Sequence, residues 1–364
     1  MLRIAVIGLG DMGAAHARGF DRLDDCRVVA TADRDAAALA IRPIEWRHEA
    51  PRHYTDFRRM LADEKPDAVV IAVPDDAHRE VAEACLDAGA DLLLEKPISN
   101  TIGDCDAIIA KAERCGAVLQ IGLVYRYSNL YRRMAELSAD PAHPVRLMWC
   151  KELRQCFPQK PWFYSQAATG GTMVEKDCHH FDLFNWMIGS RPTRVWATGG
   201  QHVWKDGSII DCDYCPDPPL AVASIDTVDH ALVTIDYENG GRASLILCMY
   251  LRPHNVMPEG LEVGAISLSG RQMIAYQDAR LGVGGLGQPL TFERMDMLAD
   301  NEGIGHIGCQ TQRREFLDAC ARRTVPTASA EVGRDALLIA LAAERSLREG
   351  RPIEISEIAP CLAS

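Results

Sequence analysis

A glycine pattern near the start of the chain constrains the fold more than any other feature. Gly8, Gly10 and Gly13 form a G-x-G-x-x-G motif between a strand-like apolar run and a helical pattern. The first glycine permits a tight turn, the second lets the backbone approach a pyrophosphate, and the third allows the helix to pack closely on the sheet. Amide groups at the start of that helix attract the phosphate charge. The motif therefore predicts a dinucleotide-binding β-α-β unit in which Asp11 and Met12 also line the cofactor.

An acidic residue closes the second apolar run of this unit. Asp33 ends the run of residues 26–33, twenty positions after Gly13. A carboxylate there accepts hydrogen bonds from the ribose hydroxyls of an adenosine and repels the additional phosphate of NADP. We therefore expect NAD as the cofactor. The neighbouring Arg34 leaves NADP as the weaker alternative.

The first third of the chain alternates apolar runs with helical patterns. Further strand-like runs occupy residues 67–74, 91–97 and 117–122, and a helical pattern at 77–89 closes on a glycine. This alternation is typical of β-α-β units in a parallel sheet. We predict an α/β fold that begins with a Rossmann domain, a doubly wound parallel sheet over residues 1–123.

A different pattern follows. Helical stretches at 128–138 and 179–188 stand among strand-like stretches at 145–154, 193–200, 228–237 and 242–250. Such a run of strands predicts a C-terminal catalytic α+β domain over residues 124–364, with a large, mostly antiparallel open sheet. Turn-forming residues predict a loop at 204–224 and a flexible connection at 282–288. Helices are predicted at 308–322 and 331–349, and the last can pack back on the first domain.

Composition narrows the class of protein. A chain of 364 residues favours two domains, and its net charge of −12 disfavours a nucleic-acid partner. No stretch stays apolar for the ~18 residues of a membrane span and no targeting pattern opens the chain, so we expect a cytoplasmic protein without a membrane partner. The 13 cysteines are scattered, which favours reduced thiols. The close pair Cys212 and Cys215 is expected to lie in a plain loop, and no metal site is predicted.

Several motifs resemble one known family. They are GLGDMGAAH (8–16), AVPDDAH (72–78), LEKPIS (94–99) and GGTMVEKDCHHFDLFNWMIG (170–189). Together they resemble the Gfo/Idh/MocA oxidoreductases, which include glucose-fructose oxidoreductase and inositol dehydrogenases. The resemblance implies a Rossmann domain followed by a domain whose open sheet makes a homodimer or homotetramer interface. It also implies cofactor contacts, which we expect from Val73, Pro74, His78, Glu95, Lys96 and Arg126.

The lysine of the LEKP motif has a physical role of its own. Lys96 follows a predicted strand of the parallel sheet, and the carboxyl ends of such strands face the cofactor crevice. An ammonium group there can hydrogen-bond a substrate hydroxyl and stabilise a developing alkoxide. The proline that follows restricts the backbone to an extended form. We expect Lys96 to act in both substrate binding and catalysis.

The second family motif can be aligned in two registers. Counting forward from the glycine pair places Lys176 and His180 in the catalytic positions. Counting back from Asp182 places Glu175 and His179 there, and we prefer this register. It keeps a carboxylate and an imidazole four residues apart, on one face of a helix.

The preferred register assigns a role to each side chain. His179 would take the proton from a substrate hydroxyl, Glu175 would orient it, and Asp182 would help to hold the substrate. His180 remains an alternative base, and either histidine could instead donate to a backbone carbonyl.

Aromatic and polar residues near these motifs suit a sugar-binding wall. They are Tyr127, Lys160, Trp162 and Tyr164. An aromatic face packs on the C–H bonds of a sugar while polar ends meet its hydroxyls. For Trp162 a place in the core is an equally open interpretation.

The favoured hypothesis is an NAD-dependent dehydrogenase of a sugar, inositol or related polyol. One alternative is an NAD-dependent glycosidase, which oxidises a ring hydroxyl transiently, eliminates the leaving group, adds water and reduces the product. Its additional acid or base would come from Glu175, His180 or Tyr164. A second alternative is a dinucleotide-binding sensor without catalysis.

Overall fold

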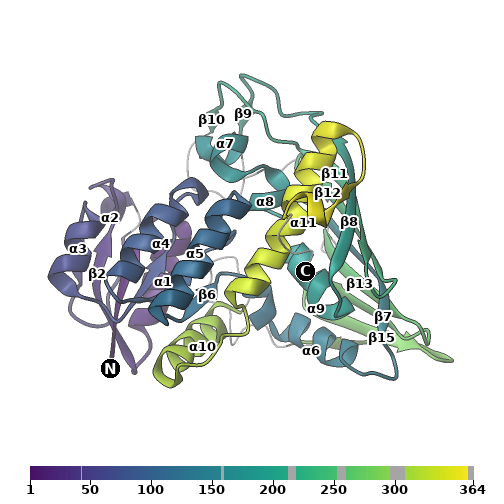
Figure 1. Cartoon of the computed structure of the whole chain (residues 1–364), viewed down its shortest axis with the longest axis horizontal. Coiled ribbons are helices and arrows are strands. Elements are labelled where there is room, and N and C mark those ends of the chain that lie inside the picture. Colours follow the sequence, from purple (N-terminus) through teal and green to yellow (C-terminus); the bar gives the residue numbers. More distant parts are fainter. Residues whose placement is uncertain are drawn as a thin grey trace. The chain divides into compact units, whose positions relative to one another are not determined.

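The computed structural model describes residues 1–41, 43–156, 160–211, 219–251, 260–276, 278–295 and 308–359. The chain forms two compact units (Figure 1). Unit 1 comprises Met1–Tyr127 and Leu298–Arg334, and unit 2 comprises Ser128–Met297 and Asp335–Ser364. No helix in the described part of the chain is long and apolar enough to span a membrane.

Unit 1 contains a six-stranded sheet in the order β3-β2-β1-β4-β5-β6. Its strands are β1 (Leu2–Ile7), β2 (Cys26–Ala32), β3 (Arg52–Tyr54), β4 (Ala68–Ile71), β5 (Asp91–Leu94) and β6 (Leu119–Ile121). All neighbouring strands are parallel, which confirms the predicted doubly wound sheet. The central strands are continuous apolar runs because helices bury both of their faces. The sequence did not indicate β3, because its three residues, Arg-His-Tyr, are polar.

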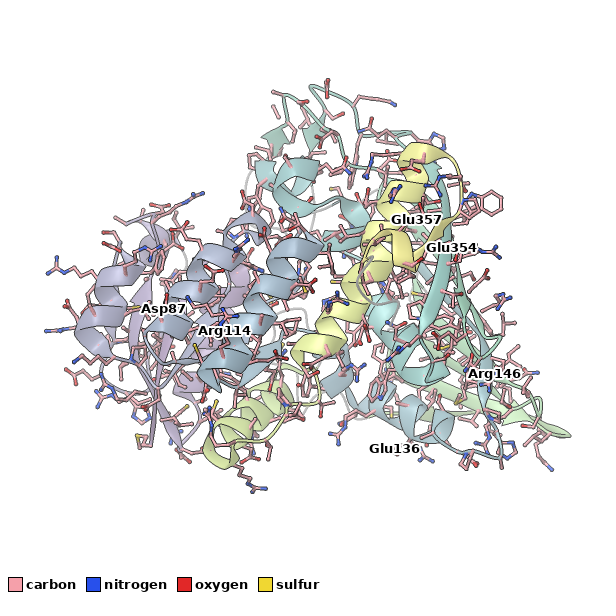
Figure 2. All side chains as sticks on the ribbon, in the orientation of Figure 1. Asp87, Arg114, Glu136, Arg146, Glu354 and Glu357 are labelled. Atoms are coloured by element: carbon pink, nitrogen blue, oxygen red, sulfur yellow. The ribbon has the colours of Figure 1, made fainter. Side chains whose placement is uncertain are left out.

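Helices surround this sheet. They are α1 (Asp11–Asp21), α2 (Ala38–Ile41), α3 (Phe57–Glu64), α4 (His78–Asp87), α5 (Ile102–Cys115) and α10 (Cys309–Arg322). Their polar faces point outward, as the exposed Asp87 and Arg114 show (Figure 2). Phe316 of α10 packs edge-on against Phe20 of α1, with ring centroids 6.3 Å apart. A helix from late in the sequence thus completes the core of unit 1.

Unit 2 contains a nine-stranded sheet in the order β16-β15-β14-β13-β7-β12-β11-β8-β17. Its strands are β7 (Val145–Leu153), β8 (Pro192–Gly200), β11 (His230–Tyr237), β12 (Arg242–Cys248), β13 (Leu261–Ser267), β14 (Gln272–Tyr276), β15 (Arg280–Gly285), β16 (Gln288–Arg294) and β17 (Ile353–Glu354). Only β7 and β12 pair in parallel among these described strands. This confirms the predicted large and mostly antiparallel sheet.

Helices cover one face of this sheet. They include α6 (Asn129–Ser138), α9 (Cys178–Ile188) and the unit 2 part of α11 (Ala330–Glu349) (Figure 1). Three short helical turns precede α9, namely η3 (Pro161–Tyr164), α7 (Gln166–Thr169) and α8 (Thr172–Glu175). Side chains on the opposite face of the sheet alternate with the buried ones and stay exposed, among them Trp196 and Leu232 at 51% and 56%.

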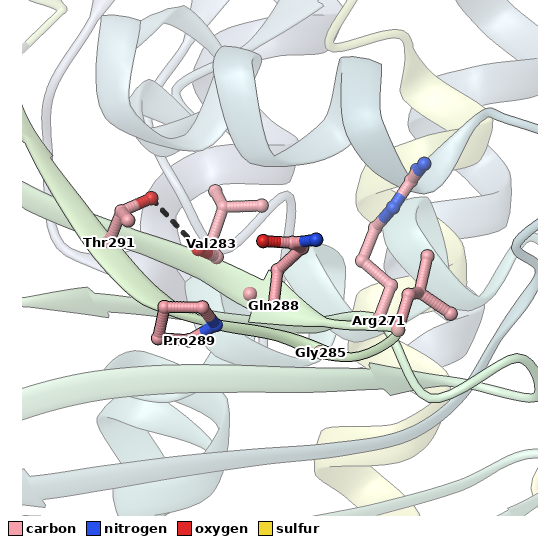
Figure 3. A pocket seen from close by; sticks show the side chains of 8 residues that line it. Arg271, Val283, Gly285, Gln288, Pro289 and Thr291 are labelled. Atoms are coloured by element: carbon pink, nitrogen blue, oxygen red, sulfur yellow. Dashed lines mark hydrogen bonds between the residues drawn. The ribbon is translucent and has the colours of Figure 1, made fainter.

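One expected flexible connection is instead a β-hairpin. Residues 282–288 belong to β15, β16 and the turn between them, where Leu286 and Gly287 have φ of 59° and 84°. The Thr291 hydroxyl donates to the Val283 carbonyl oxygen at 3.2 Å across this hairpin (Figure 3). The prediction was wrong because the glycines serve close strand contact. A Cβ at Gly282, for example, would lie 2.7 Å from the Phe292 ring.

The tract at 204–224 contains more structure than a loop. Within its described part, β9 (Ile209–Ile210) pairs with β10 (Leu220–Ala221) in an antiparallel ladder. Cys212 and Cys215 lie outside the described residues.

Candidate active site

The glycine motif of unit 1 forms a turn that only glycine fits. Gly8 has φ of +87°, and a Cβ there would lie 2.3 Å from the carbonyl oxygen of Ala72. A Cβ at Gly13 would lie 1.8 Å from the carbonyl oxygen of Gly8. Gly10 caps the start of α1, which Asp11 and Met12 open. The turn lies at the carboxyl ends of β1 and β4, the switch point of the sheet where such folds bind dinucleotides.

The acidic residue after β2 is held against this turn. The Leu9 N–H donates to Asp33 Oδ2 at 2.7 Å, and the Asp35 N–H donates to Asp33 Oδ1 at 2.9 Å. Each carboxylate oxygen keeps a second lone pair, which can accept a hydrogen bond from a ribose hydroxyl. Arg34 is exposed. The residues of the turn and Asp33 therefore fit a bound dinucleotide.

The lysine motif follows β5 and contains a cis peptide between Lys96 and Pro97. Lys96 is half-buried, whereas the preceding Glu95 is buried. Glu95 Oε1 lies 2.7 Å from His16 Nε2, and Glu95 Oε2 accepts from the Lys96 N–H at 3.2 Å. Arg313 Nε donates to His16 Nδ1 at 3.3 Å, which places the imidazole proton on Nε2, facing Glu95. This buried row of hydrogen-bonded side chains holds the backbone at Lys96 in place.

Sequence reasoning missed Arg313 and assigned His16 no function. Arg313 lies 297 residues away on α10 and is 1% exposed. The sequence feature that could have indicated a close neighbour of α1 is Gly19, a glycine inside the helix. A Cβ there would lie 2.0 Å from the Arg313 guanidinium, so a larger residue would leave no room for it.

A second histidine joins the loops after β4 and β5. His78 is fully buried, with Nδ1 2.9 Å from the Pro97 carbonyl oxygen and Nε2 3.1 Å from the Val73 carbonyl oxygen. Burial lowers the pKa of His78. Both ring nitrogens face the protein backbone, so His78 positions the neighbouring Val73 and Pro74, which are half-buried.

The segment of unit 2 that carries the paired histidines runs from α8 into α9. Lys176 and Asp177 both keep right-handed helical backbone angles, so side chains four positions apart share a face. Lys176 Nζ lies 2.9 Å from Glu152 Oε2, and His180 Nε2 lies 3.2 Å from the same oxygen. Lys176 and His180 thus both contact Glu152 of β7. Glu175 and His179, the other pair at this spacing, are also buried.

His180 is in contact with a second carboxylate. Its Nδ1 lies 3.1 Å from Asp177 Oδ1, and both side chains are fully buried. Burial raises the pKa of Asp177, and the nearby His180 opposes this. Burial also acts to raise the pKa of Glu152, but Lys176, His180 and Arg154 outweigh it and lower that pKa to about 2.

The same cluster has the spacing of a metal site. Ligand atoms of Glu152, Asp177 and His180 all lie within 4.8 Å of one another. The Lys176 ammonium already supplies a positive charge beside Glu152. The described arrangement is therefore that of a buried ion-pair network.

Comparisons with known proteins match both units. A profile of the oxidoreductase family with an NAD-binding Rossmann fold matches residues 2–123, and the GFO/IDH/MocA C-terminal domain matches residues 144–265. The chain belongs to the Gfo/Idh/MocA family. It is therefore an NAD-binding oxidoreductase, and the resemblance seen in the sequence is confirmed.

Relatives of this Gfo/Idh/MocA chain include inositol dehydrogenases. The myo-inositol 2-dehydrogenase of Thermotoga maritima is 24% identical over 98% of this chain and 99% of its own length. Inositol 2-dehydrogenase 1 of Saccharopolyspora erythraea is 32% identical over 53% of this chain and 56% of its own. An Agrobacterium radiobacter oxidoreductase, solved with NAD+, L-tartaric acid and magnesium, shares the fold with a TM-score of 0.80 at 18% identity, covering 98% and 99% of the two chains.

Two aromatic residues expected at the substrate of this Gfo/Idh/MocA protein, Tyr127 and Tyr164, are buried. Tyr164 is fully buried and packs edge-on against Trp204, with ring centroids 5.1 Å apart. The Tyr127 hydroxyl donates to Glu315 at 3.3 Å and accepts from the Ala328 N–H at 3.2 Å. Burial raises the pKa of Tyr127 well above its usual value.

The remaining expected residues differ in exposure. Lys160 and Trp162 are half-buried, and Trp162 stacks on Phe163 with centroids 4.0 Å apart. Arg126 is 8% exposed. Asp182 is 1% exposed on α9.

A glutamate that the sequence did not single out caps the start of the segment that carries the paired histidines of this family member. The Met173 N–H at the start of α8 donates to Glu344 Oε1 of α11 at 2.8 Å. Gly171 has φ of +109°, and a Cβ there would lie 2.2 Å from the Glu344 carboxyl carbon. Burial raises the pKa of Glu344 to about 7, against the opposing Met173 N–H.

Proposed function

We propose that this chain is an NAD-dependent dehydrogenase that oxidises a hydroxyl of a sugar, inositol or related polyol. The observation that carries the proposal is the division of the paired motif into two faces. Lys176 and His180 are in contact with Glu152, whereas Glu175 and His179 have the same spacing of four and so share a neighbouring face of the segment. Full-length similarity to an inositol dehydrogenase supports the substrate class.

Each side chain then has a distinct task. His179 accepts the proton of the substrate hydroxyl, and Glu175 orients its imidazole. The Lys96 ammonium hydrogen-bonds the substrate oxygen and stabilises negative charge on it. Bound NAD supplies the hydride acceptor. The half-buried Lys160 and Trp162 contribute to substrate binding. Asp182 is buried on α9 and helps to keep that helix in position.

The proposed cofactor is NAD in preference to NADP. The Asp33 carboxylate is oriented by the Leu9 and Asp35 N–H groups, so a 2′-phosphate would meet a negative charge that cannot easily turn away. Arg34 is exposed and would have to compensate this charge for NADP to bind equally well.

The proposed assembly is a homodimer or homotetramer through the exposed face of the nine-stranded sheet. Trp196 of β8, Leu232 of β11 and Ile246 of β12 stand on neighbouring strands of that face and are 51%, 56% and 43% exposed. Exposed apolar groups gathered in this way are typical of protein interfaces. Sedimentation measurements test this proposal, and a monomeric mass at micromolar concentration would reject it.

Substrate turnover tests the enzymatic proposal. The protein is incubated with NAD and a panel of inositols, aldoses and sugar acids while NADH absorbance is followed, and aryl glycosides are added in a parallel series. We expect stoichiometric NADH from at least one polyol. Tight NAD binding with no turnover of any polyol contradicts the proposal, and aglycone release without net NADH would replace it with hydrolysis.

A further inference from the structure

Four ionisable side chains meet between β7 and the segment from α8 to α9. Glu152 is 5% exposed, Lys176 is 7% exposed, and Asp177 and His180 are fully buried. Glu152 Oε2 contacts both Lys176 Nζ and His180 Nε2, while His180 Nδ1 faces Asp177 Oδ1. Every charged group of this cluster is therefore held by another chain segment or a neighbouring residue.

The contacts of His180 place it among protein carboxylates. Its Nδ1 is hydrogen-bonded to Asp177 Oδ1 at 3.1 Å, and its Nε2 lies 3.2 Å from Glu152 Oε2. Glu152 Oε2 lies 2.9 Å from Lys176 Nζ, so one carboxylate is in contact with both side chains. Removing one member of such a buried ion pair is costly, because it leaves the other charge uncompensated.

Other ionisable groups point toward the cluster from the elements packed around it. They are Cys150 on β7, Arg154 directly after that strand, Glu262 on β13 and Glu344 on α11. Burial keeps the pKa of Cys150 well above its usual value, so the thiol adds no charge. Arg154 Nη1 lies 3.5 Å from Glu152 Oε1 and favours the ionised form of Glu152.

We infer that Glu152 is a positioning residue for the proposed dehydrogenase, and that His180 belongs to this buried network and is not the catalytic base. Glu152 ties both Lys176 and His180 to β7, and this fixes the rotation of the helix that carries Glu175 and His179. His180 is fully buried, and both of its ring nitrogens lie within 3.2 Å of a protein carboxylate oxygen, so neither nitrogen is placed to take a proton from substrate.

The kinetic part of this inference rests on the proposed function, so the first test needs no substrate. A buried imidazole N–H that donates to a carboxylate gives a slowly exchanging downfield proton resonance in NMR spectra of the full-length protein. We expect such a resonance, assigned by its loss in His180→Gln. In Glu152→Gln the negative charge beside His180 Nε2 is lost, so the resonance of the Nδ1–H that bonds Asp177 should shift. Absence of a His180 N–H resonance, or one unchanged in Glu152→Gln, would overturn the inference.

Kinetics supply the second test. With any polyol that is oxidised, Glu152→Gln should lower kcat about 100-fold, because a small misplacement of a catalytic group costs about that factor. The dissociation constant of NAD should stay unchanged. The matched control is Glu357→Gln, which removes an exposed glutamate that is paired with Arg351 at 2.7 Å in the same unit (Figure 2). Equal losses in the two variants, or a His180→Gln variant as inactive as His179→Gln, would contradict the assigned roles.

A third variant distinguishes loss of the Glu152 contact from misfolding. Glu152→Gln leaves the Lys176 ammonium buried without its counter-charge and so can destabilise the unit. The double variant Glu152→Gln/Lys176→Met removes both charges and should unfold at a higher temperature than the single variant, yet it should show the same shifted His180 resonance. A wild-type resonance in the double variant, or displacement of the wild-type resonance by added Zn²⁺ or Mn²⁺, would refute the ion-pair network.

Discussion

Replacing Glu344 by Gln should change how the stability of the protein depends on pH. The Glu344 carboxyl accepts the Met173 N–H at 2.8 Å from inside the core, and burial raises its pKa from 4.5 to about 7. A glutamine keeps the acceptor oxygen and nearly the same shape but cannot ionise. The variant therefore isolates the cost of burying the charge.

The sign and size of the effect follow from these two pKa values. Because the pKa of Glu344 is higher in the folded state, the unfolded chain releases its proton first as the pH rises. Stability from this group is fully present below about pH 4.5 and is lost as the pH rises through about 7. At about 1.4 kcal/mol per pH unit, the loss is on the order of 3 kcal/mol. The free energy of unfolding of Glu344→Gln relative to wild type should rise by that amount across the interval.

Denaturant unfolding followed by tryptophan fluorescence measures this difference at several pH values. Glu349→Gln on the same helix is the control, because the hydrogen bond from Arg345 lowers the pKa of Glu349 and its difference should move in the opposite direction. A difference between Glu344→Gln and wild type that does not change with pH would refute the reasoning, since it would mean that Glu344 ionises as easily inside the protein as outside.

Three further substitutions test the nucleotide unit. Gly13→Ala should abolish NAD binding in calorimetric titrations, because its Cβ would lie 1.8 Å from the Gly8 carbonyl oxygen; normal affinity would contradict this. Asp33→Asn should weaken NAD binding about 10-fold and narrow the preference over NADP, and an unchanged ratio of the two dissociation constants would count against the assigned role. Arg313→Met leaves the buried His16 and its partner carboxylate without the guanidinium, so it should lower the free energy of unfolding by about 3 kcal/mol, and a loss below 1 kcal/mol would be inconsistent.

The sequence predicted the parts of the site that a local pattern carries. The glycine turn and Asp33 were found because a strand, a turn and an acid follow one another within a single β-α-β unit. Both sheets were predicted in type, because apolar runs and alternating strands differ in periodicity. The register of the histidine motif stayed open, because Lys176 and His180 have the same spacing as Glu175 and His179.

Residues that act across long separations could not be predicted in the same way. Glu152 lies 24 positions before Lys176, and no motif joins the two. Its only signal is a charge at an inward-facing position of β7, whose buried residues alternate with more exposed ones. Glu344 gives a similar signal, as an acid among the buried positions of α11. A single chain does not say which partner satisfies such a charge, because the partner is chosen by tertiary packing.

The place of α10 in unit 1 bears on how the protein is made. Residues Leu298–Arg334 belong to the same unit as Met1–Tyr127, and Phe316 packs against Phe20 in its core. A ribosome that has just completed Tyr127 has produced every strand of the parallel sheet but not the helix that covers Phe20 or the guanidinium beside His16. Unit 1 therefore cannot complete its core, and keeps apolar surface exposed, until nearly the whole chain has emerged. A fragment that ends at Tyr127 should accordingly need chaperones or aggregate, although it contains the complete cofactor motif.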